Sequence, residues 1–368
     1  MAFQVTSTRE QPQMMSIFDW YADKSKHTEL AAMFEYAAQQ HEHGLVANFL
    51  EKDVWVAEIL RLLYDERLLG DCSVAFKGGT ALSKCWGAIE RFSEDIDLSI
   101  HWADLSGLSE EDELTAWKTS TQSTSQNRKF RDAQQKRLVQ WSNNLVETLN
   151  ARFAQYNIAG LCANVEPDSH GEKIDIHFPR VAHSANDYQL DHILLEFGGR
   201  NRGKPTEVID VTCYMDSITA FQSLALPKAK VMAYQRDFIL WEKLTALHQF
   251  ATQEKEPNPN RLARHWYDVD CLLRMGFADP YNTPEAMLAV IEMKKYRFAN
   301  PGVDYEKILQ GQLTLIPTSK RLDEIAKDHA QAIAGGMFFT TPTSFDSIVM
   351  RLNVIQNDLN QHFAALLK

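Results

Sequence analysis

The sequence predicts an α/β (α+β) protein, in which a core with a mixed sheet is followed by an all-helical C-terminal domain. One observation is a pattern of strand, glycine turn, helix and strand within residues 72–102. A second is the alternation of apolar and polar residues in Lys173–Phe178 and His192–Phe197, which is typical of half-buried strands. A third is the helical spacing of apolar residues in nearly every stretch after Tyr234. We therefore expect an N-terminal helical extension (1–44), a core (45–220, with a helical and polar insertion at about 103–150) and a helical domain (221–368).

Composition narrows the class of protein. The chain has 368 residues, 45% of them hydrophobic and 24% charged, as in an ordinary globular protein with a sizeable core. There is no apolar run of membrane-spanning length and no apolar leader, so we expect a cytoplasmic protein with no membrane partner. A net charge of −11 argues against nucleic-acid binding over the whole surface but leaves room for local basic patches. The five cysteines are widely spaced, which indicates neither a disulfide framework nor a zinc site.

The elements around the core follow from apolar spacing. A helix is expected over His27–Gln40, and another over Leu45–Leu69, where apolar residues recur at helical intervals. Residues 103–127 are rich in Ser, Thr, Glu and Gln, so we expect a mobile excursion from the core there. A helix from Arg131 to Phe153 should follow it.

The densest chemistry of the sequence begins at Phe76-Lys77-Gly78-Gly79-Thr80. The glycine pair stands between a β-leaning stretch and a helical one, so it predicts a strand-to-helix turn whose backbone can approach a ligand closely. The N–H groups that open the helix form an anion site, to which the Thr80 hydroxyl and Lys77 are candidate contributors. The pattern predicts a phosphate-binding turn. It is not a Walker loop, because the lysine precedes the glycines.

Two aspartates follow on one strand. Asp95 and Asp97 alternate with Ile96 and Leu98, so both carboxylates should point to the same face, with Cα atoms about 6.6 Å apart. That spacing lets them share a hard cation or a pair of cations. A solvated strand face is the simpler alternative for a D-x-D pattern. The glycine turn before it, with Arg91 and Ser93 just upstream, favours the metal site.

This arrangement resembles the nucleotidyltransferase superfamily that includes DNA polymerase β. The form K-G-G-T-A-L, followed by R-x-S-x-D-I-D-L, is similar to the AbiEii/AbiGii toxin family, and the resemblance extends loosely from about residue 45 to the C-terminus. It implies an enzyme in which Asp95 and Asp97 hold two Mg²⁺ ions as catalytic residues. It also implies an NTP substrate bound by residues of this block and by one later lysine: Lys77, Gly78, Gly79, Thr80, Arg91, Ser93 and Lys243.

A third metal-binding carboxylate is implied on a strand adjacent to the D-x-D strand. Glu196, in I-L-L-E-F, is the best match to the family pattern, and Asp175 is the second candidate. An ordinary surface charge at a strand edge is the alternative for Glu196. The two stretches that carry these residues are expected to pair as antiparallel neighbours.

Lys243 is the most informative residue outside this block. Its neighbours at i−4, i−3, i+3 and i+4 are all apolar, so the ammonium should face inward and need an anion, unless it extends to the surface. The sequence K-L-T-A-L also resembles the family's second block, whose lysine is thought to contact the nucleotide phosphates.

Asp268 lies in a third block, residues 261–270, which resembles the family's R-x-x-x-D-Y-x-D-L but departs from it at His265 and Trp266. By spacing alone Asp268 could form an ordinary helical ion pair with Arg264. The resemblance instead implies that Asp268 is catalytic and orients Lys243 or the acceptor.

The family further implies transfer of an NMP to an acceptor hydroxyl of RNA, a tRNA 3′ end in some members, by the toxin of a toxin–antitoxin or phage-defence pair with a cognate antitoxin. Two basic clusters could contact such a polyanion. Their residues are Lys118, Arg128, Lys129, Arg131, Lys136 and Arg137, and then Arg200, Arg202 and Lys204. A small alcohol such as an aminoglycoside is an alternative acceptor, and a catalytically idle nucleotide-binding module is a second alternative.

Overall fold

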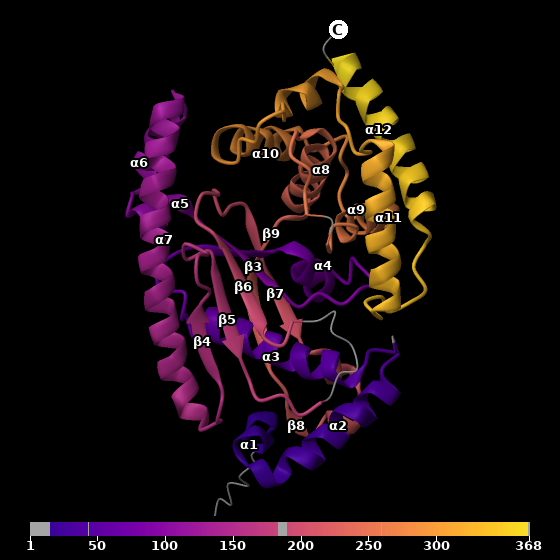
Figure 1. The fold of residues 1–368 in the computed structure, drawn as a ribbon. Coiled ribbons are helices and arrows are strands. Elements are labelled where there is room, and N and C mark those ends of the chain that lie inside the picture. The colour runs from indigo at the N-terminus through magenta and orange to yellow at the C-terminus, as the bar shows by residue number, and fades with distance from the viewer. Residues whose placement is uncertain (1–14, 43, 183–189, 259, 367–368) are drawn as a thin grey trace, which may run out of the picture.

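The computed structural model describes residues 15–42, 44–182, 190–258 and 260–366 (Figure 1). At its centre is a seven-stranded sheet with the order β4-β5-β6-β3-β2-β9-β7. Its strands are β2 (Val74–Lys77), β3 (Ile96–Ile100), β4 (Cys162–Val165), β5 (Lys173–His177), β6 (Ile193–Gly198), β7 (Thr206–Thr212) and β9 (Lys228–Tyr234). β3 pairs antiparallel with β2 and parallel with β6, so the sheet is mixed, as predicted.

N-terminal helices cover one face of the sheet. These are α1 (Ile17–Ala22), α2 (His27–Gln40) and α3 (Ala47–Tyr64), and a two-stranded sheet of β1 (Met15–Ser16) and β8 (Leu224–Ala225) lies beside them. The apolar side chains of β3, Ile96, Leu98 and Ile100, belong to the same hydrophobic cluster as α3. Because side chains alternate along a strand, Asp97 faces the opposite side of the sheet.

The insertion is helical over nearly its whole length, so the expected mobile excursion at 103–127 is wrong. It contains α5 (Trp102–Ser106), α6 (Glu110–Thr121) and α7 (Thr124–Phe153), and α7 lies along β4 at the edge of the sheet (Figure 1). Its polar composition reflects solvent exposure of most faces. A small apolar cluster of Trp102, Ala103 and Trp117, with Phe130 packed against it, holds α5, α6 and α7 together.

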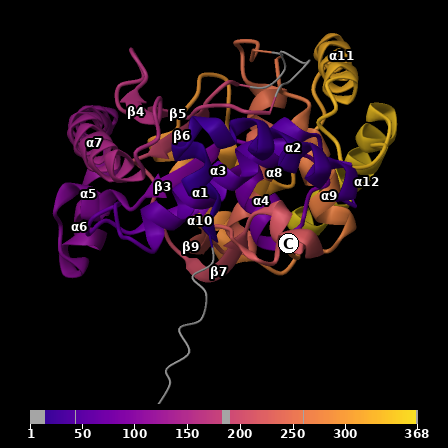
Figure 2. The ribbon, with the colours of Figure 1, turned by 90° about the horizontal axis from the view of Figure 1, so that it is seen from below.

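The C-terminal helices lie beyond the upper end of the central sheet in Figure 1. They are α8 (Arg236–Thr252), α9 (Arg264–Arg274), α10 (Pro284–Arg297), α11 (Ser319–Ala334) and α12 (Phe345–Leu366). Their hydrophobic cluster also contains Ala75 of β2 and Leu82, which ties them to the core. Viewed from below, α7 and the pair α11 and α12 lie on opposite sides of the molecule (Figure 2).

The boundary of the helical segment differs from the prediction. β8 and β9 lie within 221–368, and β9 pairs with β7 over its whole length and with β2. The helices therefore begin after Tyr234, and the expectation of an all-helical segment from residue 221 is wrong. The alternation of buried Ala229, Val231 and Ala233 with exposed residues is the signal that identifies this strand.

The connections include short 3₁₀ helices at Lys24–Lys26, Ala154–Tyr156, Tyr214–Ser217, Thr219–Phe221 and Tyr305–Gln310. Within the described residues, no helix combines the length and apolar character needed to cross a bilayer.

Candidate active site

A cavity of about 350 Å³ lies where the sheet meets the C-terminal helices. Its lining brings together predicted residues from β2, α4 (Gly78–Trp86), the connection that leads to β3, β3 itself, β6 and α8. They are Lys77, Gly78, Gly79, Arg91, Ser93, Asp95, Asp97, Glu196 and Lys243. The structure thus joins segments that are up to 166 residues apart in the sequence, from Lys77 to Lys243, in one site.

The glycine turn joins β2 directly to α4. Gly78 has φ +76°, and a Cβ there would lie 1.7 Å from Asp97 Oδ2. A Cβ at Gly79 would lie 2.6 Å from a guanidinium nitrogen of Arg91 and 2.7 Å from Ser93 Oγ. A side chain at Gly78 would be strained and would clash with Asp97, and one at Gly79 would displace Arg91 or Ser93. The start of α4 therefore lies against the carboxylate of Asp97. The helix ends at Trp86, and Gly87 in the left-handed conformation is its C-cap.

Thr80 lies outside the cavity, although its hydroxyl was expected at the phosphate site. Its side chain is fully buried, and Oγ1 donates a hydrogen bond to the backbone carbonyl of Asp95. It also lies 3.1 Å from Ser93 Oγ. Thr80 therefore holds the segment that leads into β3.

Carboxylates form the sheet side of the cavity. Asp97 of β3 is in register with Glu196 of the adjacent β6. The pKa of Asp97 is raised to about 7, first by burial and then by the negative charges of Glu196 and Asp95. Asp95 lies one residue before β3, and its Oδ1 is buried without a hydrogen-bond partner among the described residues. Such a group is costly unless a cation or donor approaches it.

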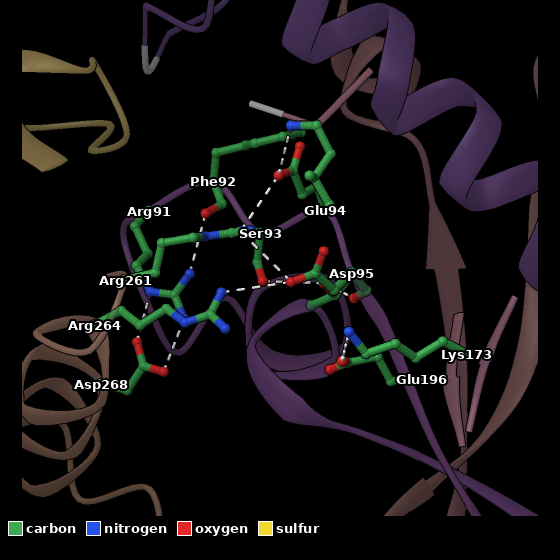
Figure 3. A network of polar contacts seen from close by, with 12 residues as sticks. Arg91, Phe92, Ser93, Glu94, Asp95, Lys173, Glu196, Arg261, Arg264 and Asp268 are labelled. Carbon is green, nitrogen blue, oxygen red and sulfur yellow. Dashed lines mark hydrogen bonds and ion pairs between the residues drawn. The ribbon is translucent and has the colours of Figure 1, made fainter. Parts of the chain in front are cut away.

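Two arginines hold the other oxygen of Asp95. Arg261 and Arg264 each lie 3.5 Å from Asp95 Oδ2, and Figure 3 shows both directed toward it. Glu196 in turn lies 3.9 Å from Lys173. In the part of the chain that is described, no group of three or more His, Cys, Asp or Glu residues has the geometry to hold a metal ion. The orphaned oxygen of Asp95 and the raised pKa of Asp97 nevertheless fit a cation between these two carboxylates.

The geometry separates the two candidates for a third carboxylate. β5 and β6 are antiparallel neighbours, as predicted. Asp175 of β5 does not line the cavity, and its Oδ1 lies 3.3 Å from His192 Nε2. Glu196 lines the cavity beside Asp97, so it is the better placed of the two candidates to bind a cation together with Asp95 and Asp97.

A lysine–aspartate–arginine network forms the helical side. Lys243 Nζ lies 2.7 Å from Asp268 Oδ2, and only 12% of the lysine side chain is exposed, so it does not extend to the surface. Arg91 binds the same carboxylate through two hydrogen bonds of 2.7 and 2.8 Å (Figure 3). Burial alone would raise the pKa of Asp268, but the charges of Arg91 and Lys243 outweigh it and lower that pKa. Asp268 thus orients Lys243, and no ion pair joins it to Arg264 in the described structure.

Several cavity residues were not identified from the sequence. Arg264 and His265 come from α9, Glu242 from α8 and Lys294 from α10. The pKa of His265 is lowered by burial and by the nearby cations, so its imidazole is neutral. Arg264 and His265 lie in the block that contains Asp268, which is a signal that could have identified them. Nothing in the local sequence around Lys294 points to this site.

The two basic clusters differ in how far neighbouring acidic residues neutralise them. Five residues of the first cluster, which lies on α6 and α7, are exposed: Lys118, Arg128, Lys129, Lys136 and Arg137. Arg131 is half-buried. The second cluster is paired with acids, since Arg202 lies 3.5 Å from Glu113 and Lys204 lies 3.8 Å from Glu110. Only the first cluster therefore presents a largely uncompensated positive surface.

A glycine turn at a helix start, paired strand carboxylates and a buried lysine–aspartate pair are together typical of a nucleotidyltransferase. Residues 61–351 match the family described as "Nucleotidyl transferase AbiEii toxin, Type IV TA system", and the chain belongs to this family. This confirms the resemblance found in K-G-G-T-A-L and R-x-S-x-D-I-D-L. The protein is therefore a nucleotidyltransferase toxin of a type IV toxin–antitoxin system.

The chain is also similar to a solved structure. This is MenT4, a nucleotidyltransferase toxin from Mycobacterium tuberculosis H37Rv, with 15% sequence identity and a TM-score of 0.46. The match covers 91% of this chain and 98% of that chain. No curated protein matches the chain significantly.

Proposed function

We propose that this toxin uses divalent metal ions to transfer an NMP from an NTP to a hydroxyl of RNA, with the tRNA 3′ end as the target, and so blocks translation. The observation that carries this proposal is the charge arrangement of one cavity. Carboxylates on the sheet side, Asp95, Asp97 and Glu196, face cations from the helices on the other side, Lys243 and Arg264. A metal–triphosphate complex has the matching charges, because its cation fits the acids and its phosphates fit the bases.

The residues have separate tasks in this reaction. Asp95, Asp97 and Glu196 would hold two Mg²⁺ ions, which lower the pKa of an attacking hydroxyl and offset charge at the α-phosphate. The Gly78–Gly79 turn, Ser93 and Lys243 would bind the triphosphate, and Asp268 with Arg91 keeps Lys243 in place. The acceptor hydroxyl loses its proton and attacks the α-phosphorus. The bond to pyrophosphate breaks, and pyrophosphate leaves.

The exposed basic residues of α6 and α7 support RNA as the acceptor. A polyanion needs cations that are free to contact phosphates, and those of α7 lie along one helix beside the sheet edge (Figure 1). The compensated cluster at Arg200, Arg202 and Lys204 contributes less to this surface.

The test is transfer from each labelled NTP to total RNA and to purified tRNA, at low and moderate salt. A triple variant with Arg128, Lys129 and Arg131 changed to Gln should label less RNA. Its salt dependence should also be shallower, by about one log–log unit for each phosphate that the variant no longer neutralises. The matched control changes three exposed lysines elsewhere, Lys307, Lys320 and Lys327, to Gln.

Three outcomes would count against parts of the proposal. RNA labelling that ignores both the salt and the triple variant excludes the α7 surface as the RNA-binding face. Labelling of an aminoglycoside-type alcohol without any labelling of RNA shows a small-acceptor enzyme instead. Full transfer after removal of divalent cations with EDTA contradicts metal dependence.

A further inference from the structure

Lys294 is a cation of the cavity that has no counter-charge of its own. It lies in the last turn of α10 and lines the cavity together with Lys77 and Glu242. Among the described residues, its ammonium forms no hydrogen bond and has no carboxylate within 4 Å. The ammonium makes a cation–π contact with the ring of Phe298, whose centroid is 5.5 Å away.

The nearest acid is already engaged elsewhere. Glu242 Oε1 lies 3.5 Å from Lys77 Nζ, so Glu242 is paired with the lysine that precedes the glycine turn. Burial lowers the pKa of Lys294; Glu242 raises that pKa and Lys77 lowers it further. An ammonium that is partly desolvated and unpaired costs free energy, and an anion that enters the cavity would recover this cost.

The position of Lys294 is fixed by the residue three places further along α10. Arg297 is fully buried between two rings, with its guanidinium carbon 4.1 Å from the centroid of Trp117 and 3.8 Å from that of Phe130. It also donates a hydrogen bond of 2.7 Å to Asn127 Oδ1. The end of α10 is therefore clamped to the insertion, and Lys294 is held at the cavity instead of moving freely in solvent.

We infer that Lys294 binds the triphosphate of the NTP, as a second phosphate-binding lysine beside Lys243. The triphosphate is favoured over an RNA phosphate because Lys294 shares its part of the cavity with Lys77, the residue that immediately precedes the Gly78–Gly79 turn. The inference rests on the nucleotidyl transfer proposed above but not on RNA as the acceptor.

The experiment compares Lys294→Gln with Lys295→Gln, its matched control. Lys295 is the next residue on the same helix, but its side chain is 38% exposed and pairs with Glu306 at 2.7 Å. Binding of the nonhydrolysable α,β-methylene analogues of ATP, GTP, CTP and UTP is measured by calorimetry with Mg²⁺. We expect Lys294→Gln to weaken binding of the preferred analogue by about 10- to 100-fold, as for removal of one charged hydrogen bond. We expect Lys295→Gln to bind within about twofold of the unmodified protein.

Steady-state kinetics give a second readout, in which Lys294→Gln should raise KM for the NTP more than it lowers kcat. Unchanged analogue affinity in a folded Lys294→Gln protein overturns the inference. An increase in KM for the acceptor alone also overturns it, because Lys294 would then contact the acceptor. If Lys294→Gln weakens binding of the analogue but the unmodified protein labels no RNA, the inference stands and the RNA acceptor fails. If it binds no analogue, both fall.

Discussion

Asp97 on the sheet side of the cavity and Asp268 on the helical side are the same chemical group in opposite electrostatic surroundings. Burial alone would raise the pKa of Asp268, but its pairing with Arg91 and Lys243 outweighs burial and lowers that pKa. Burial, and then the charges of Glu196 and Asp95, raise the pKa of Asp97 to about 7. The helical side is already compensated at Asp268. On the sheet side, within the described residues, Asp97 has no ion pair and Oδ1 of Asp95 has no hydrogen-bond partner.

The difference indicates which groups complete the fold and which await a ligand. Asp268 is already paired with Arg91 and Lys243, which favours a structural and positioning role for it. Asp95 and Asp97 need positive charge, and Lys294 across the cavity needs negative charge. Both needs are met together by a divalent cation and a triphosphate, as the proposed reaction requires.

The largest expected effect is a loss of nucleotidyl transfer at Asp97, and it distinguishes Asp97 from Asp268. Asp97→Asn should lower nucleotidyl transfer by roughly 1000-fold or more, because it removes a proposed ligand of the reacting metal. It should not destabilise the fold, since it removes repulsion from Glu196 and Asp95. Transfer rates and thermal unfolding with and without Mg²⁺ check this prediction. Mg²⁺ should stabilise the unmodified protein but not the variant. The control is Asp210→Asn, which changes an exposed residue of β7.

The reverse pattern is expected at Asp268. Asp268→Asn leaves Arg91 and Lys243 without their shared carboxylate, so the free energy of unfolding should fall by about 3–5 kcal/mol. Urea unfolding measures this change. Asp270→Asn is the matched control on the same helix, because the partners of Asp270, Arg274 and Arg351, are partly exposed and can be rehydrated. Equal decreases in the two variants would contradict the special role of Asp268.

The short-range parts of this site could be predicted from the sequence. The glycine turn, the shared face of Asp95 and Asp97, and the inward direction of Lys243 each depend on residues within about four positions of one another. The placement of Glu196 beside Asp97 also followed, because a strand pattern and a family motif coincide there.

The long-range parts could not be predicted. Arg91 and Asp268 are separated by 177 positions, and only the folded chain brings them within hydrogen-bonding distance. The insertion was misjudged for a different reason. The helix from Arg131 to Phe153 was predicted, but α6 and the start of α7 are exposed on most faces, so the apolar periodicity that identifies a packed helix is weak there. β9 was missed because the following helices dominate the pattern around it.

A smaller effect is expected at Lys243, and it tests whether Arg91 alone can hold Asp268. Lys243→Met should weaken NTP use by roughly 10- to 100-fold, because the variant cannot donate a charged hydrogen bond to a phosphate. Stability should change much less than in Asp268→Asn, since Arg91 keeps both hydrogen bonds to the carboxylate and the methionine retains the apolar volume. KM for the NTP and the unfolding midpoint are the measurements. A collapse of stability would show that Lys243 is required by the fold and not by the substrate.

The smallest effect concerns Glu51 of α3, a carboxylate whose pKa is raised without acidic neighbours. Glu51 is almost fully buried, and burial raises its pKa from 4.5 to about 6. It accepts hydrogen bonds from the backbone N–H groups of Val181 and Ala182 and from Tyr21 Oη. These hydrogen bonds lower the pKa of Glu51, but burial outweighs them, so folding favours the protonated form. Its contribution to stability is present below about pH 4.5 and is lost as the pH rises through about 6.

Glu51→Gln should remove this pH dependence, which amounts to roughly 2 kcal/mol across the window. The measurement is the difference in unfolding free energy between the unmodified protein and the variant, at several pH values, with and without Mg²⁺. We expect the difference to vary with pH in the same way in both conditions, because no cation site faces Glu51 among the described residues. A difference that changed with Mg²⁺ would mean that burial alone does not explain the raised pKa. The contrast between Asp97, which awaits a cation, and a carboxylate that is merely buried would then fail.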